Sequence, residues 1–81
     1  MAALNPFSDH LMIYYNAPEN GALNLALINL LTGTTTLLFS SNEVTTGFYQ
    51  QDFLTSSLPN SNYTLRAIFN GSVYTKNILK L

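Results

Sequence analysis

The 81-residue chain has no cysteine, no tryptophan and a single histidine, and only 9% of its residues are charged. The absence of cysteine excludes disulfides, so a hydrophobic core has to stabilise the fold, and it leaves the redox compartment undetermined. Three basic and four acidic residues give a formal net charge of −1. Binding to nucleic acid or to an anionic membrane needs clustered lysine or arginine, so neither is expected as a partner.

Long hydrophobic runs are also missing. The longest apolar stretch, Ala22 to Leu31, is interrupted by Asn24 and Asn29 and has about half the length of a membrane span. The first residues lack the basic and apolar regions of a secretory signal. We expect residues 1–81 to form one domain excised from a longer protein, with residues 1–3 added in cloning.

The chain shows no constellation of catalytic or metal-binding residues. His10 stands beside Asp9, and the other acidic residues are scattered, whereas metal sites use three or four clustered ligands. No general base accompanies the serines and threonines, and no glycine-rich phosphate loop is present. We therefore predict a domain that is not an enzyme, with no cofactor, no metal and no small-molecule substrate. His10 is expected to be exposed at the start of a strand.

What the chain does contain is a series of short strand-like segments, separated by turns at intervals of roughly ten residues. The expected strands are residues 11–15, 22–31, 34–39, 48–54, 62–69 and 72–81, with turns at 18–21, 40–43 and 58–61. In the first of these turns, Asn20-Gly21 is expected to supply left-handed geometry. Such regular spacing is typical of an all-β sandwich. The fold class predicted from the pattern is therefore all-β, with six visible strands.

One of these segments is ambiguous. Leu23, Leu27 and Leu30 have helical spacing, and leucine and alanine favour helix. As a strand, the segment would place Leu23, Leu25 and Leu27 on one face and other apolar residues on the opposite face. Because it is short and lies between Gly21 and Gly33, we favour a central strand covered on both faces over a helix.

The strongest local pattern is at the C-terminal end. Two strand-like runs, residues 62–69 and 72–81, are joined by Asn70-Gly71. This pair favours a two-residue type I′ turn, because both turn residues need a positive φ. The sequence therefore predicts a hairpin whose second strand is the last element of the chain.

Two of the three basic residues, Lys76 and Lys80, lie on one side of this last strand with Ile78 between them. Lysines on an edge strand discourage unwanted pairing. They can equally mark an accessible edge to which a partner adds a strand. The residues alone favour neither interpretation.

The register of the last strand is also open. If Val73 and Leu79 faced inward, Thr75 and Asn77 would be buried with them. A β-bulge near Lys76 would remove this conflict, so an irregular strand is expected.

Five tyrosines could form a flat surface for stacking carbohydrate: Tyr14, Tyr15, Tyr49, Tyr63 and Tyr74. Strand aromatics more often pack against neighbouring strands, and we favour packing. A carbohydrate-binding or adhesive module of a secreted enzyme is kept as the alternative function, and a fibronectin-like spacer as a third.

Several motifs, taken in order, resemble the C-terminal sorting domain (type A-like) of proteins exported by the type IX (Por) secretion system. They are Asn5–Leu11, Gly21–Gly33, Thr46–Tyr49, Leu58–Tyr63 and Val73–Lys80, and together they cover nearly the whole chain. Where the family usually has Gly-x-Tyr after Leu-Pro, this chain has Ser61-Asn62-Tyr63.

The resemblance implies a seven-stranded immunoglobulin-like sandwich at the end of a secreted protein of the Bacteroidetes type. A seventh strand would come from residues 55–58 or from the segment around Asn5-Pro6. In that family the domain is a non-catalytic sorting signal. Its partners would be the outer-membrane translocon, its shuttle protein, a sortase-like peptidase and the cargo domain that precedes it.

By the same resemblance, the cargo would pass through the periplasm and then be secreted or held at the cell surface. The recognition residues would lie around the start of the C-terminal hairpin and along its last strand: Tyr63, Asn70, Gly71, Lys76, Ile78 and Lys80.

Overall fold

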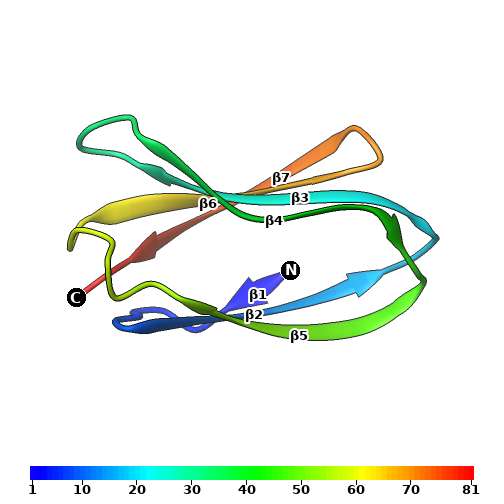
Figure 1. Ribbon diagram of the computed structural model, residues 1–81, viewed down its shortest axis with the longest axis horizontal. Helices are drawn as coiled ribbons and strands as arrows, with labels where there is room; N and C mark the ends of the chain where they lie inside the picture. Colours follow the sequence, from blue (N-terminus) through cyan, green and yellow to red (C-terminus); the bar gives the residue numbers. More distant parts are fainter.

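A computed structural model describes all 81 residues and contains seven strands and no helix (Figure 1). The strands are β1 (Ala2–Ala3), β2 (His10–Ala17), β3 (Gly21–Asn29), β4 (Thr35–Val44), β5 (Gly47–Leu54), β6 (Asn62–Phe69) and β7 (Ser72–Leu79). No helix with the length and apolarity of a membrane span occurs. The all-β fold class is confirmed, and the ambiguous segment is a strand.

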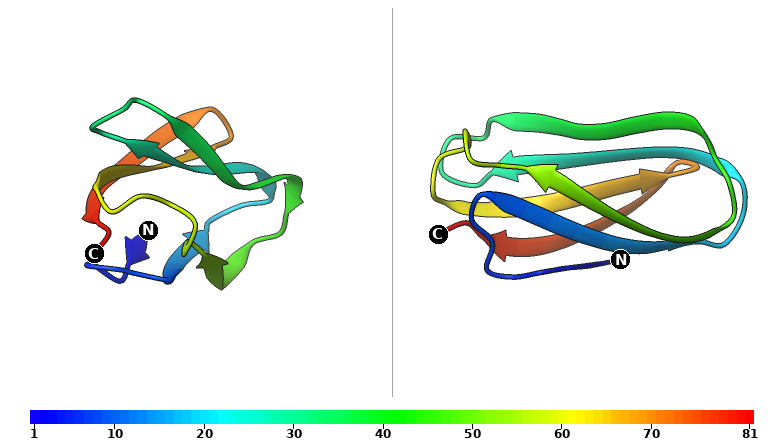
Figure 2. Two further views of the ribbon diagram at one scale, coloured as in Figure 1. Left: turned by 60° about the vertical axis from the view of Figure 1, so that its left-hand side comes forward. Right: turned by 60° about the horizontal axis from the view of Figure 1, so that its bottom comes forward.

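The strands form two antiparallel sheets that lie face to face (Figures 1 and 2). One sheet has the order β1-β2-β5 and the other the order β4-β3-β6-β7. This is the predicted immunoglobulin-like sandwich of seven strands. It differs from the constant-type immunoglobulin arrangement in one respect, because β4 joins β3 in the larger sheet instead of β5 in the smaller one.

The core lies between the sheets. It is built from the inward residues of both layers, which alternate with outward polar residues along each strand. The buried cluster consists of Phe7, Leu11, Ile13, Ala17, Leu23, Leu25, Leu27, Val44, Tyr63, Leu65, Ala67 and Ile78. Most of these residues come from β2, β3 and β6, the strands with neighbours on both sides. The edge strands contribute few core residues, so the two lateral edges of the core are thinly covered.

Strand β3 shows why the leucine spacing did not produce a helix. Leu23, Leu25 and Leu27 are buried on its inner face, and β3 pairs with β4 on one side and β6 on the other. Ladder hydrogen bonds on both edges therefore outweigh a weak helical propensity. The expected cover on both faces is present only in part. No further sheet lies over the outer face, where Ala26 is buried and Ile28 half-buried, and Leu30 lies exposed beyond the strand.

The seventh strand comes from the N-terminal segment. Ala2 and Ala3 pair with β2, and after the cis peptide bond Asn5–Pro6 the chain crosses to the larger sheet. There Phe7 forms a parallel bridge with Lys80. Of the two segments expected to supply this strand, residues 55–58 form a turn instead.

Two turn predictions need correction. Strand β4 continues through residues 40–43, which were expected to end it, and two register irregularities with β3 accommodate its length. Gly21 does not have a positive φ, although the Asn20-Gly21 pair suggested one. Gly21 instead starts β3 at a point where the side chain of Asn70 lies against its Cα.

Candidate recognition surface

No group of three or more histidine, cysteine, aspartate or glutamate side chains is placed to hold a metal. His10 is exposed at the start of β2, as predicted, and its Nδ1 lies 3.1 Å from Oδ2 of Asp52 on β5. Both side chains are about half exposed or more. A pair so accessible to water contributes little to stability.

The C-terminal hairpin has the predicted two-residue turn. Asn70 has a φ of 47° and Gly71 a φ of 84°, so both turn residues are in the left-handed region that a type I′ turn needs. The register between β6 and β7 is regular from Asn62–Leu79 to Phe69–Ser72. The expected β-bulge near Lys76 is therefore absent.

The side chain of Asn70 also ties this turn to the turn between β2 and β3. Its Oδ1 accepts a hydrogen bond from the Ala22 amide at 2.9 Å, and its Nδ2 donates to Glu19 Oε1 at 3.3 Å and to the carbonyl of Asn20 at 3.4 Å. The backbone amide of Asn70 donates to the Ala22 carbonyl at 3.0 Å. These hydrogen bonds fix the tip of the hairpin to the turn between β2 and β3, which connects the two sheets.

Tyr63 is buried at the start of β6 and its ring lies 6.1 Å from that of Phe7. Its hydroxyl donates a 2.6 Å hydrogen bond to the carbonyl of Pro59, four residues earlier. This is the tyrosine corner of immunoglobulin-like sandwiches. Burial raises the pKa of the Tyr63 hydroxyl, and a hydrogen bond with Asn29 acts in the opposite direction.

Lys76 and Ile78 on β7, and Lys80 just after it, share one side, as the alternation predicts. That side is the inner one, because Lys76 and Ile78 pair with the buried residues Leu65 and Tyr63, but the three environments differ. Lys76 is exposed, whereas Ile78 and Lys80 are buried. Lys80 donates from Nζ to Asn60 Oδ1 at 3.1 Å and from its backbone amide to the Ser61 carbonyl at 2.9 Å. Lys80 is therefore part of the closed end of the sandwich.

The six residues expected to take part in recognition thus fall into two groups. Tyr63, Ile78 and Lys80 are buried, and Tyr63 pairs directly with Ile78 across the two strands. Asn70, Gly71 and Lys76 are exposed. A partner that meets the folded domain can touch only the exposed group, while the buried group holds β7 in place.

Sequence reasoning missed how exposed the first half of β7 is. Every residue from Ser72 to Asn77 is exposed, including Val73 and Tyr74, whose exposed fractions are 59% and 55%. The smaller sheet does not reach over this part of β7, because β1 has only two residues. The signal that could have revealed it is the absence of any consistent apolar face between Ser72 and Asn77.

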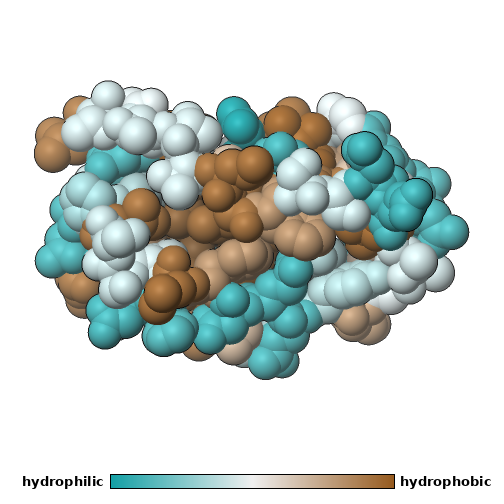
Figure 3. Space-filling model, in the orientation of Figure 1, coloured by the Kyte–Doolittle hydropathy of each residue, from teal (hydrophilic) through white to brown (hydrophobic).

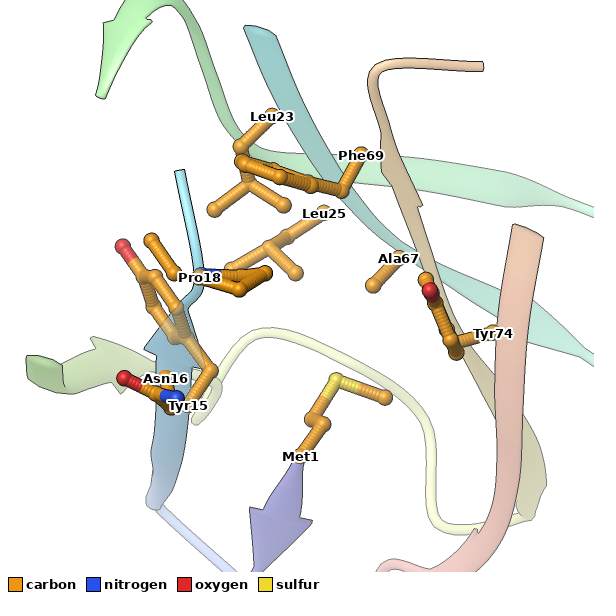
Figure 4. A pocket seen from close by; sticks show the side chains of 10 residues that line it. Met1, Tyr15, Asn16, Pro18, Leu23, Leu25, Ala67, Phe69 and Tyr74 are labelled. Carbon is orange, nitrogen blue, oxygen red and sulfur yellow. The ribbon is translucent and has the colours of Figure 1, made fainter. Parts of the chain in front are cut away.

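Next to this half of β7, the two sheets are separated by an apolar cleft of about 190 Å³ (Figure 4). The residues that line it are Met1, Tyr15, Asn16, Ala17, Pro18, Leu23, Leu25, Ala67, Phe69 and Tyr74. Ala17 and Ala67 are small inward residues of opposite sheets, so the space between them stays open. Figure 4 shows Met1 and Tyr74 on either side of the gap.

The opposite edge of the sandwich, formed by β4 and β5, carries a second apolar strip. In Figure 3 hydrophobic side chains gather in the middle of this face, between the two sheets. Inward residues of these strands, Leu38, Phe39 and Phe53, are only partly buried against the core.

The tyrosines do not share one surface. Tyr15 stacks on Tyr49 with ring centroids 5.0 Å apart, and its hydroxyl donates to Gln51 Oε1 at 3.1 Å. Burial, with a smaller contribution from Tyr49, raises the pKa of Tyr15. Tyr63 lies in the core and Tyr74 lines the cleft, whereas Tyr14 points outward from β2. The packing interpretation is confirmed for Tyr15, Tyr49 and Tyr63, whereas Tyr14 and Tyr74 are exposed on different parts of the surface.

Searches among protein-family models and among curated proteins find no match to this chain.

Proposed function

We propose that this domain is a non-catalytic sorting signal, which directs a covalently attached cargo protein through the outer-membrane translocon of a type IX secretion system. The proposal rests on the resemblance of the motifs in order along the chain. It is supported by the seven-stranded immunoglobulin-like sandwich and its exposed last strand.

Among the structural observations, the one that carries the proposal is the contrast along β7. The end of the strand is fixed by the burial of Ile78 and Lys80, while the stretch from Ser72 to Asn77 is exposed on both faces. A rigid strand held in the open is suited to recognition by a protein partner, because its backbone is already ordered before binding.

In this proposal the translocon and its shuttle protein bind β7 and the Asn70-Gly71 turn. Lys76 supplies the one exposed positive charge of the strand. A sortase-like peptidase would act on the chain that joins the domain to its cargo. The cargo would pass through the periplasm and end up secreted or at the cell surface.

The test is export of a reporter protein fused ahead of residues 1–81 in a bacterium with a type IX system. Deleting residues 76–81 would also remove the core residue Ile78, so a point variant is more informative. We expect Lys76→Gln to reduce export by about two- to fivefold, the effect of losing one exposed charge pair.

The matched control is Gln50→Glu, which makes the same change in net charge on the outer face of β5. It should leave export unchanged. A reporter carrying the unaltered domain that stays in the periplasm would contradict the proposed function.

A further inference from the structure

The free edge of β7 exposes unpaired backbone groups. On the side away from β6, the Leu79 amide donates to Asn5 Oδ1 at 2.9 Å and the Leu79 carbonyl accepts from the Phe7 amide at 3.0 Å. In an antiparallel pair, every second residue directs its N–H and C=O to the same side. Val73, Thr75 and Asn77 therefore direct theirs to this edge, where no backbone partner is present.

The pairing with Phe7 ends at the last residues of the strand, so the open ladder runs from Val73 to Asn77. An added strand of five residues spans about 17 Å. It would continue the contact that Phe7 begins and would lie over the gap between Tyr74 and Met1, where the apolar cleft opens.

The inward face of β7 specifies the side chains of such a strand. Tyr74 and Lys76 are two residues apart on this face, since they pair with the buried residues Ala67 and Leu65. Tyr74 borders the apolar cleft, and Lys76 has no acidic partner within salt-bridge distance. A cavity of about 150 Å³ lined by apolar residues accepts a benzene ring, so the cleft has room for one large apolar side chain.

From this geometry we infer that the edge of β7 and the cleft form one binding site for an extended strand of a partner protein. The strand pairs with Val73, Thr75 and Asn77 through its backbone. It places a large apolar side chain in the cleft beside Tyr74 and a carboxylate beside Lys76, two residues away on the same face. This inference rests on the proposed function only in naming the secretion apparatus as the source of the strand.

The first test uses synthetic peptides and the 81-residue domain. A threonine- and valine-rich heptapeptide carries leucine and glutamate two positions apart, in either order, and the control has the same composition with the two residues adjacent. Adjacent residues point to opposite faces of a strand, so the control should bind about 30-fold more weakly, the loss expected when an anchor leaves its pocket.

Binding is followed by NMR through the backbone amides of Val73, Thr75 and Asn77. These amides should become protected from hydrogen exchange by the test peptide, and the control peptide with adjacent leucine and glutamate should leave them unprotected at the same concentration. The preferred order of leucine and glutamate tells a parallel from an antiparallel strand, and either preference supports the site. If neither order binds more tightly than the control, the inference is overturned.

Thr75→Pro is the variant that tests the edge. It removes an outward N–H and adds a ring at the edge, and the ladder with β6 is kept because that N–H does not point toward β6. Thr75→Val keeps the donor and serves as its control. We expect loss of peptide binding in the first variant and unchanged binding in the second, with both folded by their amide spectra.

In the reporter assay, export by the unaltered domain together with retention of the folded Thr75→Pro variant supports both proposals. Export of both proteins overturns strand addition and leaves the sorting function standing. Retention of both contradicts the sorting function, and the peptide measurement then decides the binding site. If the domain self-associates and Thr75→Pro abolishes this self-association, a second copy of the domain occupies the β7 edge. That result would overturn the inference that a strand of a partner protein binds there.

Discussion

Asn70 contributes to the fold through both its backbone and its side chain. Its positive φ closes the hairpin, and its amide group binds the turn between β2 and β3. The first role follows from the Asn-Gly pair and was predicted. The second depends on Gly21, 49 positions earlier in the chain, having no side chain, and no local pattern indicates it.

Gly21→Ala should destabilise the domain by about 1–3 kcal/mol, the usual cost of adding a methyl group where there is no room. A Cβ at Gly21 would collide with the side chain of Asn70. Urea unfolding measures the change. In an Asn70→Gly background the same substitution should cost much less, and an equal cost in both backgrounds would refute this contact.

Tyr63 should make the stability fall at alkaline pH. Burial raises its pKa above the ordinary value of 10.0, so the folded protein keeps a proton that the unfolded chain has lost. Its contribution is complete below the unfolded pKa and is lost as pH rises through the folded pKa. Urea unfolding between about pH 8 and about pH 11 measures the slope.

Tyr63→Phe should flatten part of this slope, leaving the part due to Tyr15, whose pKa is also raised. Tyr14→Phe, at an exposed position, is the control and should leave the pH dependence of the unfolding free energy unchanged. An unchanged profile for Tyr63→Phe would show that the hydroxyl is not buried in solution.

At the scale of single elements, the strands follow from alternation and turn chemistry wherever one face is buried. Strand β5 was located to within a residue because its inward aromatics alternate with polar residues. Strand β4 runs longer than expected because pairing with β3 continues past the last β-branched residues. In β7 the side facing inward could not be read from the sequence, because most of that strand faces solvent on both sides.

The two halves of β7 should respond differently to truncation of a side chain. Ile78→Ala should cost about 2–5 kcal/mol, since Ile78 is buried against the core. Val73→Ala, on the exposed half of the same strand, should change the stability by less than about 0.5 kcal/mol. Thermal and urea unfolding compare the two variants, and similar losses in both would mean that the first half of β7 is packed as well.

At the scale of the whole molecule, the two sheets meet closely at one end and leave a cleft at the other. This difference arises because Phe7 closes the edge near Lys80, while only Met1 and the two-residue strand β1 lie near Tyr74. Small residues at Ala17 and Ala67 keep the cleft open. The open cleft is the feature that gives β7 a specific surface rather than a bare edge.

Filling this cleft should stabilise the domain. Ala67→Leu extends an inward side chain toward the open space, and cavity filling commonly adds about 0.5–2 kcal/mol. Ala26→Leu is the control, because Ala26 is buried on the outer face of β3 with no cavity beside it. It should be neutral or destabilising. A loss of stability in Ala67→Leu would show that the sheets already meet there.

The amino-acid pattern alone was enough to predict an all-β sandwich, its C-terminal hairpin and the exposed position of His10, because alternation and turn geometry depend on neighbours in sequence. It could not predict which side chains of β7 are buried, the contact between Asn70 and Gly21, or the cleft beside Tyr74. These features depend on how far one sheet extends over the other, and that is determined by contacts between residues distant along the chain.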